Sequence, residues 1–211
     1  MKFRKIGLAL GALSATIGLM ILAGWLVTPE TPRRPAGLTA PGEITAVSVD
    51  IGGPFELVSH EGKVTTDADF RGQHLLIFFG YTYCPDVCPT ALQGLSVALD
   101  ELGPLAARVQ PLFISVDPKR DTPEALAAYV EAFHPGILGL TGTPAQIAEV
   151  AKAYHAFYAR AEEGGDEDSY LVDHSAYIYL MGPDGAYRSM FSHGTPPKDL
   201  ADSIRSYLDA G

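Results

Sequence analysis

The longest uninterrupted hydrophobic stretch of this chain lies at its amino end. An uncharged run of 22 residues, from Ile6 to Val27, measures roughly 33 Å as a helix, enough to cross a bilayer core of about 30 Å. Basic residues precede this run, and such a flank stays in the cytoplasm, so the remainder is predicted to be exported. A cleaved signal peptide has a shorter apolar region and a small-residue cleavage site. We therefore predict an uncleaved membrane anchor over residues 1–27, with a cleaved signal as the alternative.

A proline-rich segment follows the anchor. Residues 28–42 hold four prolines and no apolar periodicity, a composition typical of an extended tether. The globular part is therefore predicted to span residues 43–211 as a single domain.

Within this domain, strand-like and helix-like patterns alternate. His74–Phe79 is largely apolar and predicts a central strand covered on both faces. A helical pattern runs from Val87 to Leu102, and threonine–proline pairs then mark the starts of three further helices. The remaining predicted strands are Glu43–Val47, Phe55–Ser59, Val109–Val116, Leu138–Leu140 and the hairpin of Ser175–Leu180 with Ala186–Phe191; the remaining helices run from Thr122 to Phe133, from Thr143 to about Phe157 and from Thr195 to about Leu208.

This order of elements predicts an α/β fold with a mainly parallel sheet and an antiparallel hairpin at its edge. It is the thioredoxin-like arrangement, with extra amino-terminal β-strands and one transmembrane helix ahead of the domain. Ligands of such sheets collect at the carboxyl ends of the strands. The chain's two cysteines, Cys84 and Cys88, follow the first central strand at that place.

Charge and composition narrow the function classes. The formal charge of −10 argues against a nucleic-acid binder held by phosphate contacts. Beyond residue 40 there are 10 Lys and Arg against 24 Asp and Glu, so the exported part carries about −14. Two cysteines are too few for a disulfide-stapled miniprotein. In an oxidising compartment such a pair becomes a disulfide unless a reductant or a metal keeps it open.

The spacing of the two cysteines predicts their chemistry. Residues four apart in the first turn of a helix share one face, and the helix amino end favours thiolates. Two thiolates can attack a disulfide, close into one, or bind a soft metal. A structural disulfide here closes only a tiny loop and stabilises little.

A histidine stands where thioredoxin-type oxidoreductases carry a proline. Those enzymes have two residues between their cysteines, whereas this chain has three, and the segment before strand Ser175–Leu180 ends in Asp173 and His174. An imidazole is a metal ligand, and two thiolates with one imidazole suit Cu(I), with Cu(II) in a tetragonal variant. Structural zinc would normally have a fourth protein ligand.

Three motifs together resemble the Sco/SenC family of membrane-anchored, thioredoxin-fold copper-binding proteins. They are YTYCPDVCPT, ISVDPKRDTPE and YLVDHSAYIYLMGPDG, in the family's order, and the resemblance covers roughly residues 43–208. It implies copper bound by Cys84, Cys88 and His174 and delivered to the binuclear copper centre of cytochrome c oxidase during assembly. It also implies partners: a copper-accepting oxidase subunit, and other copper chaperones or a thiol reductant.

Three carboxylates are candidates for supporting roles around these ligands. Asp173 is placed to orient His174 by a hydrogen bond, Asp86 to tune the thiolates, and Asp117 to shape the site from the neighbouring strand; each has a plain alternative as a solvated loop or turn residue. The acidic segment Glu162–Asp168 is predicted to be a solvated loop whose mobility lets the histidine approach or leave. Other candidates are predicted to be non-ligands, packing residues or walls of the site: His60, His74, His134, His155 and His193; Met181 and Met190; Tyr81 and Tyr83.

Other functions use the same residues. A membrane-anchored thiol–disulfide oxidoreductase would attack with Cys84 and resolve with Cys88, and His174→Ala would spare it. A peroxiredoxin-type peroxidase fits less well, because the threonine three residues before its attacking cysteine is replaced by Tyr81. A copper-responsive redox sensor stays open. An Arg-rich and Ser-rich transit segment is not evident, which favours a bacterial inner membrane with the domain in the periplasm.

Overall fold

The computed structural model describes residues 50–161 and 169–209. The predicted anchor, the linker, the strand Glu43–Val47 and the acidic segment Glu162–Asp168 lie outside these ranges. Within the two described ranges, no helix is both long and apolar enough to span a bilayer.

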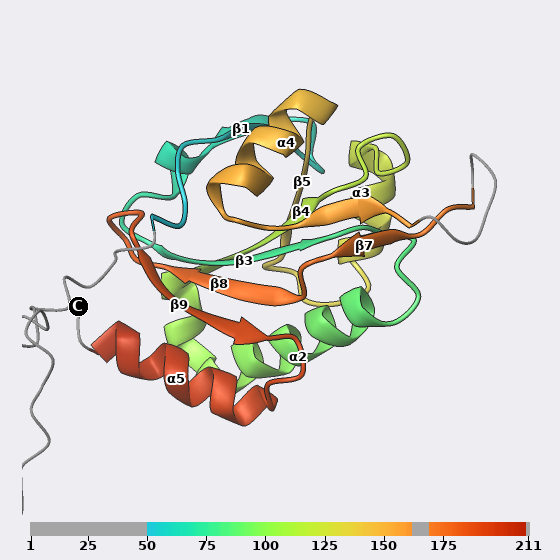
Figure 1. The fold of residues 1–211 in the computed structure, drawn as a ribbon. Coiled ribbons are helices and arrows are strands. Elements are labelled where there is room, and N and C mark those ends of the chain that lie inside the picture. Colours follow the sequence, from blue (N-terminus) through green and yellow to red (C-terminus); the bar gives the residue numbers. More distant parts are fainter. Residues whose placement is uncertain (1–49, 162–168, 210–211) are drawn as a thin grey trace, which may run out of the picture. The chain divides into compact units, whose positions relative to one another are not determined.

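Seven strands of the described residues form one sheet in the order β2-β1-β5-β4-β3-β8-β9 (Figure 1). Only the central strands β3, β4 and β5 pair in parallel, while β1, β2, β8 and β9 pair antiparallel. The prediction of a mainly parallel sheet is therefore wrong at one edge, because β1 joins β5 antiparallel and carries β2 with it. The strands are β1 (Glu56–Ser59), β2 (Val64–Thr66), β3 (His74–Gly80), β4 (Val109–Ser115), β5 (Leu138–Thr141), β8 (Tyr177–Met181) and β9 (Tyr187–Ser192).

Two very short strands form a separate antiparallel ribbon. β6 (Tyr158–Arg160) pairs with β7 (Val172–His174), and Tyr158 lies opposite His174. The sequence pattern predicted neither strand, because three residues are too few to show an alternation of apolar and polar positions. Because His174 is the last residue of β7, its pairing with β6 fixes the position of its backbone.

Within the described ranges, four α-helices cover the sheet. They are α2 (Val87–Leu102), α3 (Pro123–Val130), α4 (Pro144–Ala153) and α5 (Pro197–Asp209), with short 3-10 helices η1 (Asp67–Phe70) and η2 (Gly103–Arg108). α2 and α5 lie together on one face of the sheet, and α3 and α4 lie on the other (Figure 1). The side chains of Thr122 and Thr143 accept the backbone N–H groups that open α3 and α4, as their threonine–proline pairs predict.

The predicted central strand is the centre of the core. Every residue of β3 is buried, with α2 and α5 on one side and the opposite helical layer on the other. Of the five apolar positions at helical spacing in α2, Ala91, Leu95, Ala98 and Leu102 are buried against the sheet, whereas Val87 is only partly buried. Each large aliphatic or aromatic side chain buried in this way contributes about 1.5–3 kcal/mol. The first turn of α2 is therefore attached to the most rigid part of the fold.

Two predicted helices end earlier than expected. α3 ends at Val130 rather than Phe133, and α4 ends at Ala153 rather than near Phe157. His155 adopts a left-handed backbone with φ of 52°, a conformation that an α-helix cannot contain. The chain turns there, so residues 154–157, predicted as the end of a helix, instead lead into β6.

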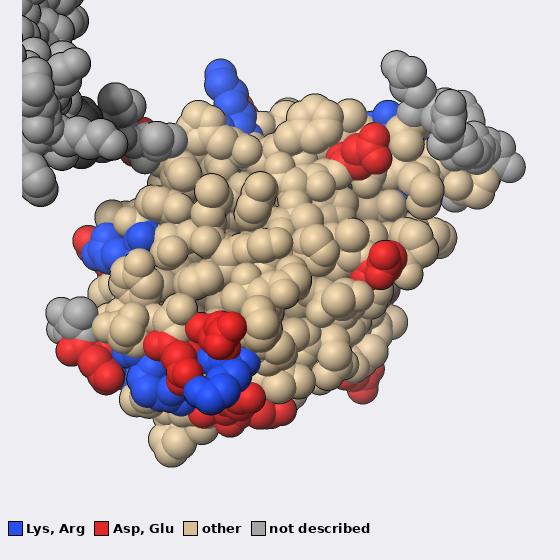
Figure 2. Space-filling model, turned by 60° about the horizontal axis from the view of Figure 1, so that its bottom comes forward, with Lys and Arg blue, Asp and Glu red and all other residues tan. Residues whose placement is uncertain are grey.

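Acidic and basic side chains are interspersed on the face that Figure 2 shows, rather than separated into patches. On α5, for example, Asp202 pairs with both Lys198 and Arg205. Large parts of this face carry neither charge (Figure 2). The net negative charge of the chain is therefore not concentrated here.

Candidate metal centre

The two cysteines flank the start of α2. Cys88 lies in the first turn of the helix and is completely buried, whereas Cys84 lies in the turn before it and is half-buried. The prediction that both stand on the first helical turn is therefore wrong for Cys84. Its Sγ instead accepts the Cys88 backbone N–H at 3.3 Å, as an N-cap side chain would. The N–H groups and partial positive charge of a helix amino end thus face this sulfur.

The last residue of β3 leaves room for the Cys88 sulfur. A Cβ added at Gly80 would lie 2.7 Å from Cys88 Sγ and 2.7 Å from the Phe113 ring. Neither neighbour can withdraw easily, because both are buried in the core. Glycine at this position therefore lets the strand backbone approach the buried thiol directly.

His174, at the end of β7, completes a compact group with the two thiols. Its Nε2 lies 3.2 Å from Cys88 Sγ, and its Nδ1 lies 3.1 Å from the Ser175 carbonyl oxygen. A carbonyl only accepts, so we assign the proton to Nδ1, which donates to it and leaves the Nε2 lone pair directed at the sulfurs. The rings of Phe78 and Tyr81 meet the imidazole edge to face, with centroids at 5.9 and 5.8 Å.

The two thiols have opposite acidities. A hydrogen bond from Cys88 lowers the pKa of Cys84 to about 3, hydrogen bonds from backbone N–H groups act in the same direction, and partial burial opposes them. The same hydrogen bond, together with burial, raises the pKa of Cys88. One thiolate and one thiol therefore share a proton at neutral pH.

The donor atoms fit a soft metal ion. The two Sγ atoms and a ring nitrogen of His174 all lie within 4.8 Å of one another, and both cysteines are free. Across residues 50–161 and 169–209 this is the one group of at least three His, Cys, Asp or Glu residues with such spacing. Two sulfurs and one imidazole suit Cu(I) better than a hard cation, and among the residues that the structure describes no fourth His, Cys, Asp or Glu joins the group to complete a structural zinc site.

The three predicted supporting carboxylates lie in different surroundings. Asp86 and Asp173 are exposed, and the Ser175 carbonyl makes the contact with His174 Nδ1 that was expected of Asp173. Asp117 is buried and accepts hydrogen bonds from Arg120 and from the hydroxyl of Tyr170, at 2.6 Å for the latter.

Sequence reasoning missed a second buried carboxylate in the same motif. Asp121 is completely buried and accepts hydrogen bonds from the Ser115 hydroxyl at 2.6 Å and from the Thr82 hydroxyl and amide at 2.6 and 3.0 Å. The signal that could have found it is its position four residues after Asp117, in the same charged turn after a central strand.

The remaining candidates lie elsewhere or line the site. None of the other five histidines belongs to the cysteine–histidine group. Met181 is fully buried, as predicted for a packing residue, whereas Met190 is about half exposed on β9. Tyr81 is buried against His174, and Tyr83 is exposed beside the Arg120 guanidinium. The position of Tyr81 agrees with its predicted role as a wall of the site, whereas the contact found for Tyr83 is with the Arg120 guanidinium.

Fold and site together define a thioredoxin-like α/β protein with a cysteine–cysteine–histidine group at the carboxyl end of its central strand. The family model described as SCO1/SenC matches residues 45–209, and this chain belongs to that family.

Relatives of the chain agree with this assignment. The mitochondrial SCO2 homologue of Bos taurus is 46% identical over 160 residues, which is 75% of this chain and 60% of that protein. The protein SenC of Rhodobacter capsulatus is 40% identical over 204 residues, 94% of this chain and 90% of that one. The structure of Bradyrhizobium japonicum ScoI with copper bound has a TM-score of 0.70 and 45% identity, covering 75% of this chain and 99% of that one. This chain thus spans only part of the mitochondrial relative's length but nearly all of SenC.

Proposed function

We propose that this protein is a copper metallochaperone that binds one copper ion through Cys84, Cys88 and His174. The observation that carries the proposal is the convergence of two thiol sulfurs and one imidazole nitrogen within 4.8 Å at the end of the central strand. Family membership supports copper as the metal, since solved relatives from Bradyrhizobium japonicum, Arabidopsis thaliana and yeast have copper bound.

The same geometry suits release as well as binding. Cys84 and His174 are only half-buried, so an acceptor's thiolates reach the metal from their side while Cys88 still holds it from the core. Copper would then pass by exchange of one ligand at a time, without a change in the chain's covalent bonds. We propose the binuclear copper centre of cytochrome c oxidase as the acceptor during assembly, with another copper chaperone as donor.

We further propose that the predicted segment 1–27 anchors the protein in a bacterial inner membrane, with the copper-binding domain in the periplasm. The uncharged run of 22 residues behind a basic flank supports this arrangement. Protease treatment of spheroplasts that express the full chain tests it. Digestion of the domain without cell lysis is the expected result, and protection of the domain in intact spheroplasts would contradict it.

The first test of copper binding is Cu(I) affinity, measured by chelator competition on the reduced protein and on His174→Ala. Tight one-to-one binding is expected, with at least about tenfold weaker binding in the variant, a loss of about 1.4 kcal/mol. His134→Ala is the matched control, because its imidazole lies outside the cysteine–histidine group and its affinity should equal that of the unchanged protein. Weak binding, or binding indifferent to His174, would overturn the proposal.

A second function, reduction of the acceptor's cysteines, is favoured by the opposite acidities of the two thiols. A low pKa at half-exposed Cys84 suits an attacking thiolate, and a protonated, buried Cys88 suits a resolving thiol. His174→Ala separates the two functions: a reductase should keep most of its rate of disulfide reduction in this variant, whereas a copper carrier should lose affinity. A reductase role alone would leave Cu(I) binding weak in both proteins.

A further inference from the structure

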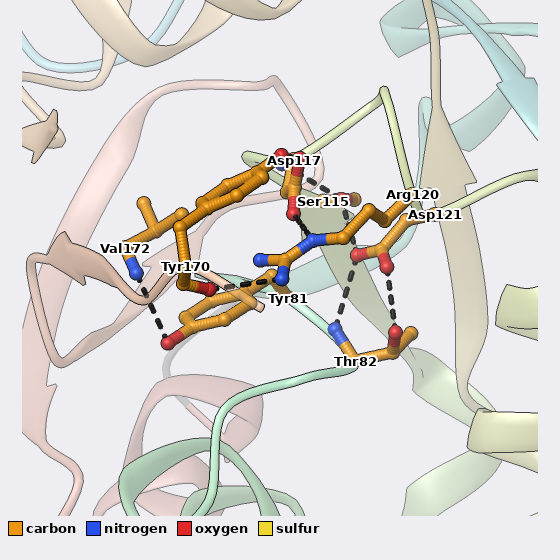
Figure 3. A network of polar contacts seen from close by, with 8 residues as sticks. All are labelled: Tyr81, Thr82, Ser115, Asp117, Arg120, Asp121, Tyr170 and Val172. Carbon is orange, nitrogen blue, oxygen red and sulfur yellow. Dashed lines mark hydrogen bonds and ion pairs between the residues drawn. The ribbon is translucent and has the colours of Figure 1, made fainter. Parts of the chain in front are cut away.

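The two halves of the cysteine–histidine group come from different parts of the fold, yet one loop contacts the segments that lead to both, at Thr82 and at Tyr170. This is the β4–α3 loop, Asp117–Asp121, which leaves the strand beside β3 and enters α3. Figure 3 shows the Asp121 side chain of this loop directed toward Thr82 and its Arg120 side chain directed toward Tyr170. Thr82 lies two residues before Cys84, and Tyr170 lies shortly before the strand that carries His174.

The first contact of the loop is with the chain that enters β7. Arg120 donates through Nε to Asp117 and through Nη1, at 2.8 Å, to the Tyr170 carbonyl oxygen. The Tyr170 hydroxyl returns to Asp117 Oδ1 at 2.6 Å, which closes a ring of three residues (Figure 3). Both members of the ion pair are almost fully buried. A buried, hydrogen-bonded ion pair of this kind specifies geometry more than it adds stability.

Aromatic contacts extend this first arm to the imidazole itself. The Arg120 guanidinium carbon lies 3.7 Å from the Tyr170 ring centroid and 5.7 Å from that of Tyr81. The Tyr81 hydroxyl accepts the Val172 backbone N–H at 3.1 Å, and the Tyr81 ring packs edge to face with His174. Through Tyr81, the loop therefore contacts both the His174 ring and Val172, which lies two residues before it.

The second arm of the loop holds the approach to the thiols. Asp121 accepts both the amide and the hydroxyl of Thr82, two residues before Cys84, and is itself held by Ser115 at the end of β4. A buried carboxylate is costly unless its oxygens accept several hydrogen bonds, and here three donors supply them. The turn that carries Cys84 is therefore attached to Asp121, in the same loop whose Arg120 is attached to the segment before His174.

We propose that the β4–α3 loop is a positioning element that sets the distance between the two thiols and the imidazole, with Arg120 and Asp117 acting on His174 and Asp121 acting on Cys84. The inference rests on the proposed function for the identity of the metal. None of these side chains touches the metal, so each is a positioning residue, and its effect reaches copper only through a ligand.

A double-mutant cycle separates positioning from general stability. Cu(I) affinity is measured by chelator competition for the unchanged protein, Arg120→Lys, His174→Ala and the double variant. Arg120→Lys keeps the charge but cannot donate to Asp117 and to the Tyr170 carbonyl in the same forked geometry. Outer partners of metal ligands are worth roughly 10–100-fold in affinity, so a loss of roughly tenfold is expected in the presence of His174 and almost none in its absence.

The matched control is Arg188→Lys. Arg188 also pairs with a carboxylate three to four residues away, Asp184 at 2.8 Å, but in the β8–β9 hairpin. Its Cu(I) affinity should stay within about twofold of the unchanged protein. An equal loss for Arg120→Lys with and without His174 would overturn the assignment of Arg120 to the imidazole, as would no loss in either background.

The outcomes distinguish failure of the inference from failure of the proposed function. If His174→Ala itself leaves affinity unchanged, the three-ligand copper site is wrong. If His174→Ala weakens binding but Arg120→Lys does not, the site stands and the positioning role of Arg120 is wrong.

A readout without metal gives an independent check. In the reduced apoprotein, Arg120→Lys should speed hydrogen exchange at the Val172 amide at least about fivefold, because the ribbon opens more often. The amides of β3 should not change. Tyr170→Phe, which removes only the hydroxyl that donates to Asp117, should act in the same direction by a smaller factor. Unchanged exchange at Val172 in both variants would overturn the first arm.

The second arm is tested with Thr82→Val, which removes the hydroxyl donated to Asp121 while preserving the size of the side chain. Because this arm acts on Cys84, the loss of Cu(I) affinity should be the same with and without His174. Thr90→Val is the control, because Thr90 is an exposed residue near the start of α2. A loss that disappears in the His174→Ala background would show that Thr82 acts on the imidazole instead, and would overturn the division of the loop into two arms.

Discussion

The thiol side and the imidazole side of the cysteine–histidine group are built in opposite ways. Cys88 is completely buried at the start of a 16-residue helix that packs on the central strand. His174 ends a three-residue strand in a ribbon that is separate from the seven-stranded sheet. The hydrophobic core therefore places the Cys88 sulfur, whereas a few polar and aromatic contacts place the imidazole. This difference suits a metal carrier, because the buried Cys88 can keep the metal bound while His174 dissociates from it.

The largest difference between the two sides is expected in hydrogen exchange of the reduced apoprotein. Amides of β3 should exchange only through global unfolding, while those of β7 should exchange through local opening at least about 100-fold faster. Because global unfolding exposes much more surface than local opening, the rate of exchange at β3 should rise steeply with denaturant concentration, and the rate at β7 only weakly. Addition of Cu(I) should slow β7 more than β3, since the metal joins the ribbon to the core. Equal exchange in the two strands would remove the basis of the comparison.

Within the thiol side, the two cysteines should differ in alkylation. Cys84 has a pKa of about 3 and stays a thiolate above pH 5, so its reaction with iodoacetamide should be nearly independent of pH from 5 to 8. An ordinary thiol slows about tenfold for each unit below its pKa. Buried Cys88, with its raised pKa, should react at least about 100-fold more slowly at pH 7. Mass spectrometry of the modified peptides measures both rates.

The control for the alkylation experiment is Cys88→Ala. Loss of the Cys88 hydrogen bond removes the main cause of the low pKa of Cys84. Alkylation of Cys84 in this variant should then fall as pH decreases from 8 to 6. A rate for the unchanged protein that already falls tenfold per pH unit would show that Cys84 is an ordinary thiol.

A substitution in the core should damage the thiol side specifically. Gly80→Ala places a methyl group 2.7 Å from Cys88 Sγ, and overpacking of this kind costs about 1–3 kcal/mol. Denaturant unfolding measures the loss of stability. Gly94→Ala in α2 is the matched control, because a Cβ there meets no atom within 4 Å and alanine is the better helix former by about 0.5–1 kcal/mol. Equal stability of the two variants would contradict the close approach at Gly80.

The smallest effect is expected on the imidazole side, at the residue next to the histidine. Asp173 is exposed and the Ser175 carbonyl already contacts His174 Nδ1, so Asp173→Asn should change Cu(I) affinity less than about twofold. Chelator competition at two salt concentrations separates a general charge effect from a specific one. A loss of tenfold or more that is independent of salt would restore Asp173 as the residue that orients the imidazole.

Regular patterns made most of the fold predictable. The buried strand His74–Phe79, the helix from Val87 to Leu102 and two of the three threonine–proline helix starts were predicted from apolar spacing and capping residues, and the structure confirms them. The third helix, α5, begins at Pro197 rather than directly after Thr195. The metal-binding chemistry of the two cysteines and His174 was also predictable, because His174 stands where a thioredoxin-type enzyme has a proline. Ribbon strands of three residues left no such pattern.

The sequence by itself determined which atoms are available for a metal: two sulfurs after a central strand and an imidazole before the next one. Only the tertiary structure decided how they are held. Cys84 proved to precede the helix and to accept its N–H group, and Asp121 rather than Asp86 or Asp173 proved to bind the loop before the thiols. The physical reason is that local spacing specifies strands, helices and caps, whereas hydrogen bonds between residues 39 and 50 positions apart, such as Thr82 with Asp121 and Arg120 with Tyr170, exist only once the core has brought their segments together.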